Sequence, residues 1–248
     1  MSLLKSEKEN LKNKFLTYFI DIEPSMNIKK AALIFNEHFD FNKEKLSKFL
    51  EKGISKYNNV PYHNAVHGLN TLYTGSIYLK MLCNYRIERN NKLLFLICCY
   101  LHDIGHPDLV TEFNCIFNID LKNELFIIEE FINATNLINH DSILKEFLNK
   151  YYVIKNNIKE ISMIELKILI KLSDLSTSYK DFKNFSVGSQ NLKNEMSSLV
   201  QKYDQNKEDL FFIKKYAIPL AKYFSNIFID FKFLYINGCE NAKRLNTL

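Results

Sequence analysis

The sequence predicts an all-α protein that folds as one compact, multi-helix domain over residues 1–248. Hydrophobic residues form 47% of the chain, which can supply a sizeable core at this length. The chain has only 6 glycines and 4 prolines, so hairpin turns and glycine-rich phosphate loops have little to be built from. Apolar residues recur at helical spacing, as at Leu11 and Phe15 or at Leu46 and Phe49. These three observations together favour helices from the beginning of the chain.

We expect this single domain to comprise N-terminal helices (1–56), a region with the candidate site (57–224), and a C-terminal helix and tail (225–248). A helical pattern follows the proline of "VPYHNAVH", and a polar connection leads from it to the run "KLLFLICCYLHDIGHPD". We expect this run to be a helix that ends near Gly105 and Pro107, because proline disfavours helical dihedrals in the residue before it.

The second half of the chain is expected to continue in the same way, with one exception. Further helices are expected at 121–139, 142–154 and 158–175, and a last pair from about 210 to 234 is expected to break near Pro219. Residues 183–208 are the most polar part of the chain, and they are expected to form a mobile loop around a short helix.

Composition limits the partners and the location that can be expected. The net charge of +5 comes from lysines scattered among acidic residues, and no dense basic block indicates nucleic-acid or membrane-surface binding. The 5 cysteines have no CxxC spacing, as expected for reduced thiols in the cytosol. No uncharged apolar run is long enough to be the core of a signal peptide or a membrane span. We therefore expect a soluble cytoplasmic protein without a membrane segment, and pairing with a second copy stays open.

The strongest local feature is the segment "LHDIGH". His102 and Asp103 end a helix whose preceding turns are almost wholly apolar, and such residues are costly to bury unless a partner satisfies them. A purely structural explanation stays open, because His102 can donate to a backbone carbonyl and Asp103 can cap the next element. A dipeptide alone does not make a metal site.

Two further stretches supply groups of the same kind. In "YHNAVH", His63 and His67 fall on one face if the segment after Pro61 is helical. In "LIKLSDLS", Asp174 lies on a helix with a core face, where a carboxylate needs a cation or a metal. Each stretch alone also has a purely structural explanation. The two histidines can be exposed to solvent or packed in the core, and Asp174 can form a salt bridge with a lysine. Jointly, the three stretches supply imidazoles and carboxylates, a set suited to Zn²⁺ or another divalent metal.

These stretches resemble the motifs of the HD-type metal-dependent phosphohydrolases and, more narrowly, the catalytic domain of the class I cyclic nucleotide phosphodiesterases. "VPYHNAVH" is followed by "YLHDIGHPDLVTEF", which is similar to the family's segment of His-Asp, two residues and His. "LIKLSDLS" is similar to the family's Lys-Ala-Asp-Ile-Ser segment, and "FIKKYAIPL" to its Phe-Ile and Pro-Leu pair. The similarity runs in order from about residue 57 to 224. It implies a compact helical domain that hydrolyses cAMP, cGMP or both to the 5′-monophosphate.

The resemblance also implies roles for individual residues. The resemblance implies that His67, His102, Asp103 and Asp174 hold a tightly bound metal, expected to be zinc. It also implies that Asp103 bridges to a second ion, magnesium or manganese. A metal pair lowers the pKa of a shared water and neutralises charge on the phosphoryl oxygens. His63 is implied to be the general acid that protonates the departing ribose oxygen.

Residues around these ligands follow the family pattern less closely. His106 is implied to orient a bound water or a metal ligand. Where the family carries a glutamate followed by two histidines, this chain offers "LKNELFIIEEF". Glu124 is the candidate carboxylate that supports His63, and Glu129 or Glu130 are the alternatives.

The nucleotide pocket departs further from the family pattern. The glutamine that family members carry three residues before the Phe-Ile pair is Asp209 here, and the asparagine expected after "DLS" is Thr177. A carboxylate accepts hydrogen bonds but does not offer both a donor and an acceptor, as an amide does. Phe212 remains available to stack on a base, and Tyr62 is implied to line the same pocket. Two alternatives therefore stay open beside the cyclic nucleotide phosphodiesterase: a phosphohydrolase of linear nucleotides, and a nucleotide-binding protein without turnover.

Overall fold

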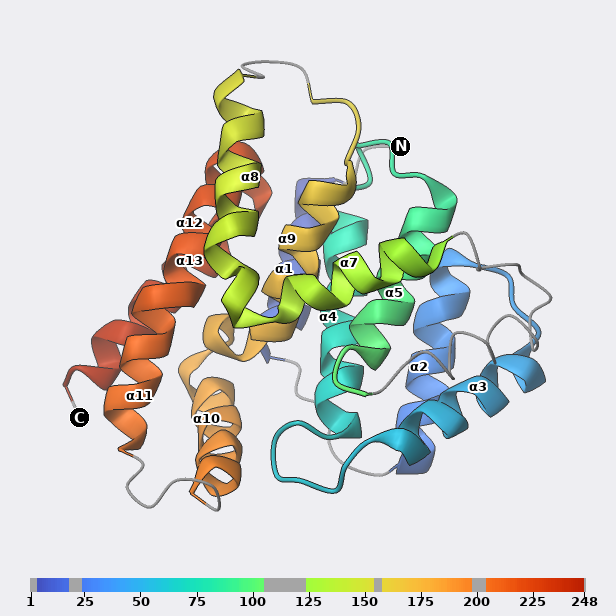
Figure 1. Ribbon diagram of the computed structural model, residues 1–248, viewed down its shortest axis with the longest axis horizontal. Helices are drawn as coiled ribbons and strands as arrows, with labels where there is room; N and C mark the ends of the chain where they lie inside the picture. The colour runs from blue at the N-terminus through green and yellow to red at the C-terminus, as the bar shows by residue number, and fades with distance from the viewer. Residues whose placement is uncertain (1–3, 18–23, 105–123, 154–157, 198–203, 248) are drawn as a thin grey trace.

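A computed structural model describes residues 4–17, 24–104, 124–153, 158–197 and 204–247 of the chain (Figure 1). Within these ranges the only β pairing is an isolated bridge between Arg86 and Glu160, so the prediction of an all-α fold is confirmed. The α-helices are α1 (Lys5–Thr17), α2 (Pro24–His38), α3 (Lys43–Lys56), α4 (Ala65–Met81), α5 (Arg89–Leu101), α7 (Leu125–Thr135), α8 (His140–Val153), α9 (Met163–Asp174), α10 (Phe182–Met196), α11 (Gln205–Phe212), α12 (Ile218–Ile227) and α13 (Lys232–Leu245). The short helices are the 3-10 helices η2 (Leu137–Asn139), η3 (Leu175–Tyr179) and η5 (Ile229–Phe231) and the π-helical turn η4 (Ile213–Ala217).

Three helices, α4, α5 and α9, pack against one another in the middle of this arrangement. In Figure 1, α2 and α3 lie to one side of these helices, and α10 to α13 lie to the other. Every residue of α5 from Leu93 to Leu101 is buried, as expected for a helix with core on all sides. His102, which follows Leu101 directly, is also buried, so its ring nitrogens need partners.

Two glycines allow α4 to approach its neighbours closely. A Cβ atom at Gly75 would lie 2.8 Å from Sγ of Cys99, and one at Gly68 would lie 2.8 Å from the carbonyl oxygen of Tyr100. A Cβ at Gly68 would also collide with the hydroxyl of Tyr57. Because these distances are shorter than van der Waals contact, a side chain at either position would force the helices apart. The close approach of α4 to α5 thus depends on residues that have no side chain.

Helix α9 is shorter at its beginning than the predicted 158–175. Ser162 forms a capping box with Glu165, in which Oε2 of Glu165 accepts hydrogen bonds from the backbone N–H and the hydroxyl of Ser162, both at 2.7 Å. Residues before this cap are extended and bond to Arg86: its N–H donates to the carbonyl of Lys159 at 2.8 Å, and its carbonyl accepts from Ile161 at 2.9 Å. The helix therefore begins where its first N–H groups are satisfied by side chains.

The prediction of a mobile loop around a short helix at 183–208 is wrong for residues 182–196, which form the 15-residue helix α10. Asp181 caps this helix by accepting from the N–H of Asn184 at 2.9 Å. Phe185, Leu192 and Met196 recur at helical spacing and line one cavity, so the helix has an inner face that the polar composition concealed.

The predicted break near Pro219 is also wrong. The chain stays helical from Gln205 to Ile227, through α11, the π-helical turn and α12. Pro219 comes directly after the π-helical turn η4, in the first turn of α12, so the hydrogen bond that proline cannot donate is lost where the helical register already changes. The interruption comes instead at Phe228, and α13 then runs to Leu245. Of the helices in the described ranges, none has the length and apolar character needed to cross a membrane.

Candidate active site

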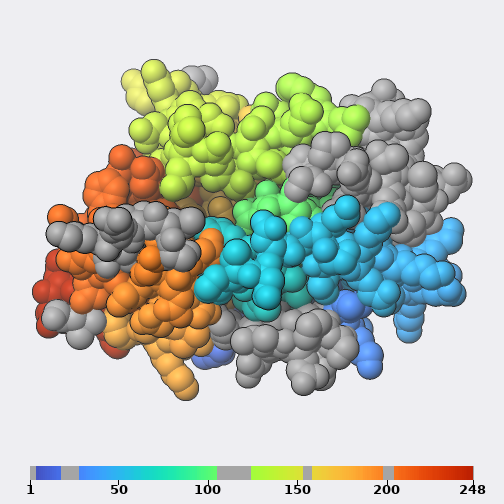
Figure 2. Space-filling model, turned by 60° about the horizontal axis from the view of Figure 1, so that its bottom comes forward, coloured from blue at the N-terminus to red at the C-terminus, as the bar shows by residue number. Residues whose placement is uncertain are grey.

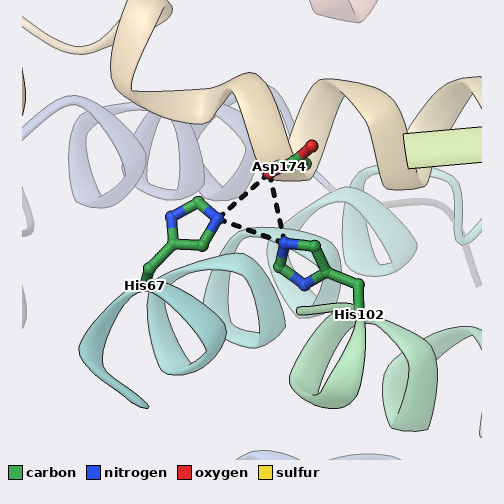
Figure 3. A group of neighbouring side chains, drawn as sticks. All are labelled: His67, His102 and Asp174. Carbon is green, nitrogen blue, oxygen red and sulfur yellow. Dashed lines mark hydrogen bonds and ion pairs between the residues drawn. The ribbon is translucent and has the colours of Figure 1, made fainter. Parts of the chain in front are cut away.

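Three side chains from the three central helices point toward one another (Figure 3). His67 lies in the first turn of α4, His102 directly follows α5, and Asp174 is the last residue of α9. The Nε2 atoms of His67 and His102 are 3.1 Å apart, and Oδ1 of Asp174 lies 3.0 Å from the first and 3.2 Å from the second. The structure thus brings together residues separated by up to 107 positions in the chain.

The fourth predicted ligand, Asp103, lies beside the same three atoms. Its Oδ2 is 3.4 Å from Nε2 of His67 and 3.3 Å from Nε2 of His102. Two ligand atoms at about 2.1 Å from one ion are about 3.0 Å apart at a right angle and about 3.4 Å apart at the tetrahedral angle. The spacings between these atoms therefore fit a shared divalent cation, and His67, His102 and Asp174 form a group that could hold a metal ion.

The surroundings of His102 fix which ring nitrogen faces the other ligands. Its Nδ1 lies 3.2 Å from the carbonyl oxygen of Cys99, which can only accept, so in the neutral ring the proton is on Nδ1 and the lone pair is on Nε2. This orientation is the one that metal-bound histidines adopt. The hydrogen bond from His102 to a backbone carbonyl, expected if the residue is purely structural, is therefore present. The same bond also orients the ring so that Nε2 can bind a metal.

The side chains of this group also shift one another's pKa values. Burial lowers the pKa of His102, but the negative charges of Asp174 and Asp103 outweigh this effect and raise the pKa to about 9. Burial raises the pKa of Asp174, and its interactions with His102 and His67 outweigh burial and hold the pKa well below its usual range. Two carboxylates converging on two buried imidazoles in this way are suited to a positive charge at their centre.

The carboxylate that supports His63 is Glu195 of α10. Oε1 of Glu195 lies 2.7 Å from Nδ1 of His63, and Oε2 accepts from the backbone N–H groups of Tyr62 and His63 at 2.8 and 2.9 Å. Burial tends to raise the pKa of Glu195, but these hydrogen bonds outweigh burial and lower it. Because Nδ1 is engaged by Glu195, Nε2 is the ring nitrogen of His63 available to exchange a proton with a ligand.

This contact corrects the prediction that Glu124 supports His63. Oε1 of Glu124 instead accepts a hydrogen bond from Asn90 at 3.0 Å. Of the alternatives, Glu130 pairs with Lys167, and no interaction joins Glu129 to His63 in the part of the chain that the structure describes. Figure 2 shows why α10 can supply the carboxylate: its orange atoms adjoin the cyan atoms of the segment that precedes α4.

His63 and His67 do not share a helix face in the expected way, because α4 begins only at Ala65. Asn64 caps the helix, accepting from the N–H groups of Val66 and His67 at 2.8 and 3.3 Å. His63 therefore lies before the cap, yet its ring centroid is 5.6 Å from that of His67. The cap, rather than a helical turn, sets the position of His63 beside the ligands.

A cavity of about 740 Å³ opens beside these residues. Tyr62, His63, Asp103 and Asp174 line part of it, and residues of η3, α10 and α11 line another part. All four predicted substrate-binding residues lie in this lining: Tyr62, Thr177, Asp209 and Phe212. The hydroxyl of Tyr62 donates to Oγ1 of Thr177 at 3.2 Å, which joins the ligand side of the cavity to the side formed by η3.

Three polar residues at or beside the cavity wall were not identified from the sequence: Ser189, which lines the cavity, Gln205, which bonds to Ser189, and Glu195, which bonds to His63. All three come from α10 and α11, and Ser189 and Gln205 are hydrogen-bonded to each other at 2.5 Å. The helical recurrence of Phe185, Ser189 and Leu192 was the available signal for this face. One predicted residue, His106, lies outside the described residues.

Two solved structures, each of a phosphodiesterase domain, have the same fold. The phosphodiesterase domain of the rhodopsin phosphodiesterase from Salpingoeca rosetta superposes with a TM-score of 0.81 at 19% identity, over 99% of this chain and 95% of that one. A second structure of this domain, from the RhoPDE fusion protein, gives 0.81 at 18% identity over 97% of both chains. The chain has the phosphodiesterase catalytic-domain fold.

Sequence comparison agrees with this fold. The chain is 28% identical over 245 residues to cGMP-specific 3′,5′-cyclic phosphodiesterase gamma of Plasmodium yoelii. The alignment covers 79% of this chain and 31% of that protein. It is 30% identical over 164 residues to cGMP-specific 3′,5′-cyclic phosphodiesterase alpha of Plasmodium falciparum, over 59% of this chain and 17% of that protein. It is also 30% identical over 181 residues to the dual 3′,5′-cyclic-AMP and -GMP phosphodiesterase beta of the same organism, over 70% and 14%.

The chain spans less than a third of the length of each of these curated relatives. No protein-family profile matches it. Both the fold and the relatives nevertheless confirm the resemblance to cyclic nucleotide phosphodiesterase domains that the motifs predicted.

Proposed function

We propose that this chain is a single catalytic domain that hydrolyses a 3′,5′-cyclic nucleotide, cAMP or cGMP, to the 5′-monophosphate. The observation that carries the proposal is the convergence of two histidines and two aspartates at a cavity of about 740 Å³, with the His63–Glu195 pair beside them. The Plasmodium relatives support it, since their names are those of cGMP-specific or dual cyclic nucleotide phosphodiesterases.

His67, His102 and Asp174 are proposed to hold a zinc ion, because imidazole nitrogen and carboxylate oxygen are ligands that zinc accepts. Asp103, whose side chain is 25% exposed, is proposed to bridge to a second ion, magnesium or manganese, which prefers oxygen ligands and retains waters. Such a metal pair supplies Lewis-acid activation of water and neutralises charge on the phosphoryl oxygens.

The reaction exchanges one bond at phosphorus for another. The oxygen of water forms a bond to phosphorus, the P–O3′ bond breaks, and the departing ribose oxygen takes up a proton. His63 is proposed to deliver this proton from Nε2, because Glu195 engages Nδ1 and would stabilise the imidazolium form. Tyr62, which stacks its ring edge-on against that of His63 at 4.9 Å, restricts the positions that the imidazole can take.

A hydrolysis assay on the purified protein tests the proposal. We expect cGMP, cAMP or both to be converted to the 5′-monophosphate in added Mg²⁺ or Mn²⁺, and we expect elemental analysis to find bound zinc. His63→Gln should lower kcat by about 10²- to 10⁴-fold while the zinc content stays the same. The matched control is His38→Gln on α2, where the new side chain can keep the hydrogen bond to Ser76.

A panel of linear nucleotide monophosphates and triphosphates separates the alternatives. Cleavage of linear phosphates with cyclic nucleotides untouched would make the chain a phosphohydrolase of another substrate class. Binding of a cyclic nucleotide without product, with both metals supplied, would make it a binding protein. Undiminished hydrolysis by His63→Gln would remove His63 from the mechanism.

A further inference from the structure

The cavity wall formed by α10 and α11 contains a hydrogen-bonded group of three side chains, Asp209, Ser189 and Gln205. The hydroxyl of Ser189 donates to Oδ2 of Asp209, and Nε2 of Gln205 donates to Oγ of Ser189 at 2.5 Å. Asp209 and Ser189 are only 7% and 5% exposed, and both line the cavity. A nearly buried carboxylate is therefore placed where a ligand in the cavity can reach it.

The direction of these hydrogen bonds determines what Asp209 offers to a ligand. An amide nitrogen only donates, so the oxygen of Ser189 accepts from Gln205 and its single hydrogen is directed to Asp209. A carboxylate that receives a hydrogen bond is favoured in its ionised form. Burial acts in the opposite direction and raises the pKa of Asp209 above its usual value, although hydrogen bonds from Ser189 and Gln205 both act to lower it. Further donors from a ligand would therefore stabilise the charged form of this carboxylate.

Phe212 lies three residues after Asp209, so the two side chains share one face of α11, and both line the cavity. A flat base stacked on the ring of Phe212 would therefore present its edge to Asp209. Guanine has two adjacent donors on one edge, the ring N1–H and the exocyclic N2 amine, which match two carboxylate oxygens. Adenine has one amine beside an unprotonated ring nitrogen, whose lone pair would face a carboxylate oxygen unfavourably.

We infer that Asp209, held as an acceptor by Ser189 and Gln205, makes this cavity select guanine over adenine, so that the preferred substrate is cGMP. That cGMP is hydrolysed rests on the proposed function. The preference for guanine is a property of binding and can be measured separately. The two are therefore tested in parallel, by binding of the linear monophosphates and by hydrolysis of the cyclic nucleotides.

The experiment measures calorimetric binding of 5′-GMP and 5′-AMP, and hydrolysis of cGMP and cAMP, for the wild-type chain and its variants. We expect 5′-GMP to bind about 10- to 100-fold more tightly than 5′-AMP, the discrimination typical of a bidentate contact to a base. Asp209→Asn should bring this ratio close to one, because one acceptor oxygen is replaced by an amide NH2, whose hydrogens would face the donors of guanine. Ser189→Ala should give an intermediate ratio, and Ser186→Ala, exposed on the same helix, should keep the wild-type ratio.

The outcomes separate the inference from the proposed function. Equal binding of the two monophosphates by the wild-type chain, or an unchanged ratio in Asp209→Asn, would overturn the inference even if both cyclic nucleotides are hydrolysed. A preference for 5′-GMP that depends on Asp209, without hydrolysis of either cyclic nucleotide, would support guanine selection and overturn the proposed function.

Discussion

The two walls of the cavity hold their polar groups in different ways. On the metal-ligand wall, His67, His102 and Asp174 project from α4, the end of α5 and α9, three helices that are packed against one another and largely buried. On the wall formed by α10 and α11, Asp209 and Ser189 are held by hydrogen bonds on helices whose other faces are exposed. The proposed metal ligands are therefore positioned by core packing, whereas the groups proposed to recognise the base are positioned by a few hydrogen bonds.

The largest effect is expected from breaking the metal-ligand wall at Asp174. Asp174→Asn removes the charge that faces both imidazoles at 3.0 and 3.2 Å. A divalent metal supplies several kcal/mol to phosphoryl transfer, so we expect kcat/KM to fall about 1,000-fold or more. Bound zinc, measured by elemental analysis, should fall in parallel. Asp40→Asn, at an exposed position between α2 and α3, is the matched control, and full zinc occupancy with full activity in Asp174→Asn would refute the assignment.

The metal-ligand wall could be predicted from the sequence because its residues are out of place in their surroundings. His102 and Asp103 follow nine consecutive buried residues, Leu93–Leu101, and charged groups are rarely buried without partners. Few arrangements satisfy such residues, so the family motif and the physical argument point to the same site. The capping box of Ser162 and Glu165 was equally readable as S-x-x-E before an apolar run, although the helix was expected to start earlier.

The other wall could not be predicted in the same way. Glu195 lies in a polar stretch where a glutamate is ordinary, and its contact with His63 spans 132 residues of sequence. No local pattern distinguishes it from Glu124, which lies nearer to the family's position but contacts Asn90. The uninterrupted helix through Pro219 depends on a π-helical turn, and such turns have no reliable sequence signal. The sequence prediction failed where contacts between residues far apart in the chain determine the structure.

A second prediction tests how strongly packing supports the metal-ligand wall. Gly68→Ala places a methyl group against the carbonyl oxygen of Tyr100 and the hydroxyl of Tyr57, neither of which can move without disturbing α5. We expect a loss of up to about 3 kcal/mol in the free energy of unfolding. Gly238→Ala in α13 is the control, because its nearest neighbour would be 3.4 Å away and alanine favours a helix. Equal melting temperatures for the two variants would show that α4 is not held this tightly.

A third prediction concerns the contact that joins the two walls. Glu195→Gln keeps the shape of the side chain but removes the charge beside His63, so the imidazolium form is less stabilised. Residues that orient a functional group in this way typically contribute about 10- to 100-fold, and we expect kcat for cyclic nucleotide hydrolysis to fall by that factor with KM little changed. Glu124→Gln is the control and should retain the wild-type kcat. A larger effect from Glu124→Gln than from Glu195→Gln would restore the assignment made from the sequence.

The smallest effect is expected at Gly188, where η3 and α10 meet at the cavity. A Cβ atom there would collide with Cγ2 of Thr177, so Gly188→Ala should displace Thr177 and weaken its hydrogen bond from the hydroxyl of Tyr62. Overpacking that costs about 1 kcal/mol corresponds to about a fivefold rise in KM, and kcat should change little because the metal ligands lie on other helices. Thr177→Ser removes Cγ2 and keeps the hydroxyl, so the double variant should recover most of the KM. Recovery would show that the wall of α10 and α11 can be reshaped without touching the reacting groups, whereas an equal fall in kcat would mean that the two walls are coupled.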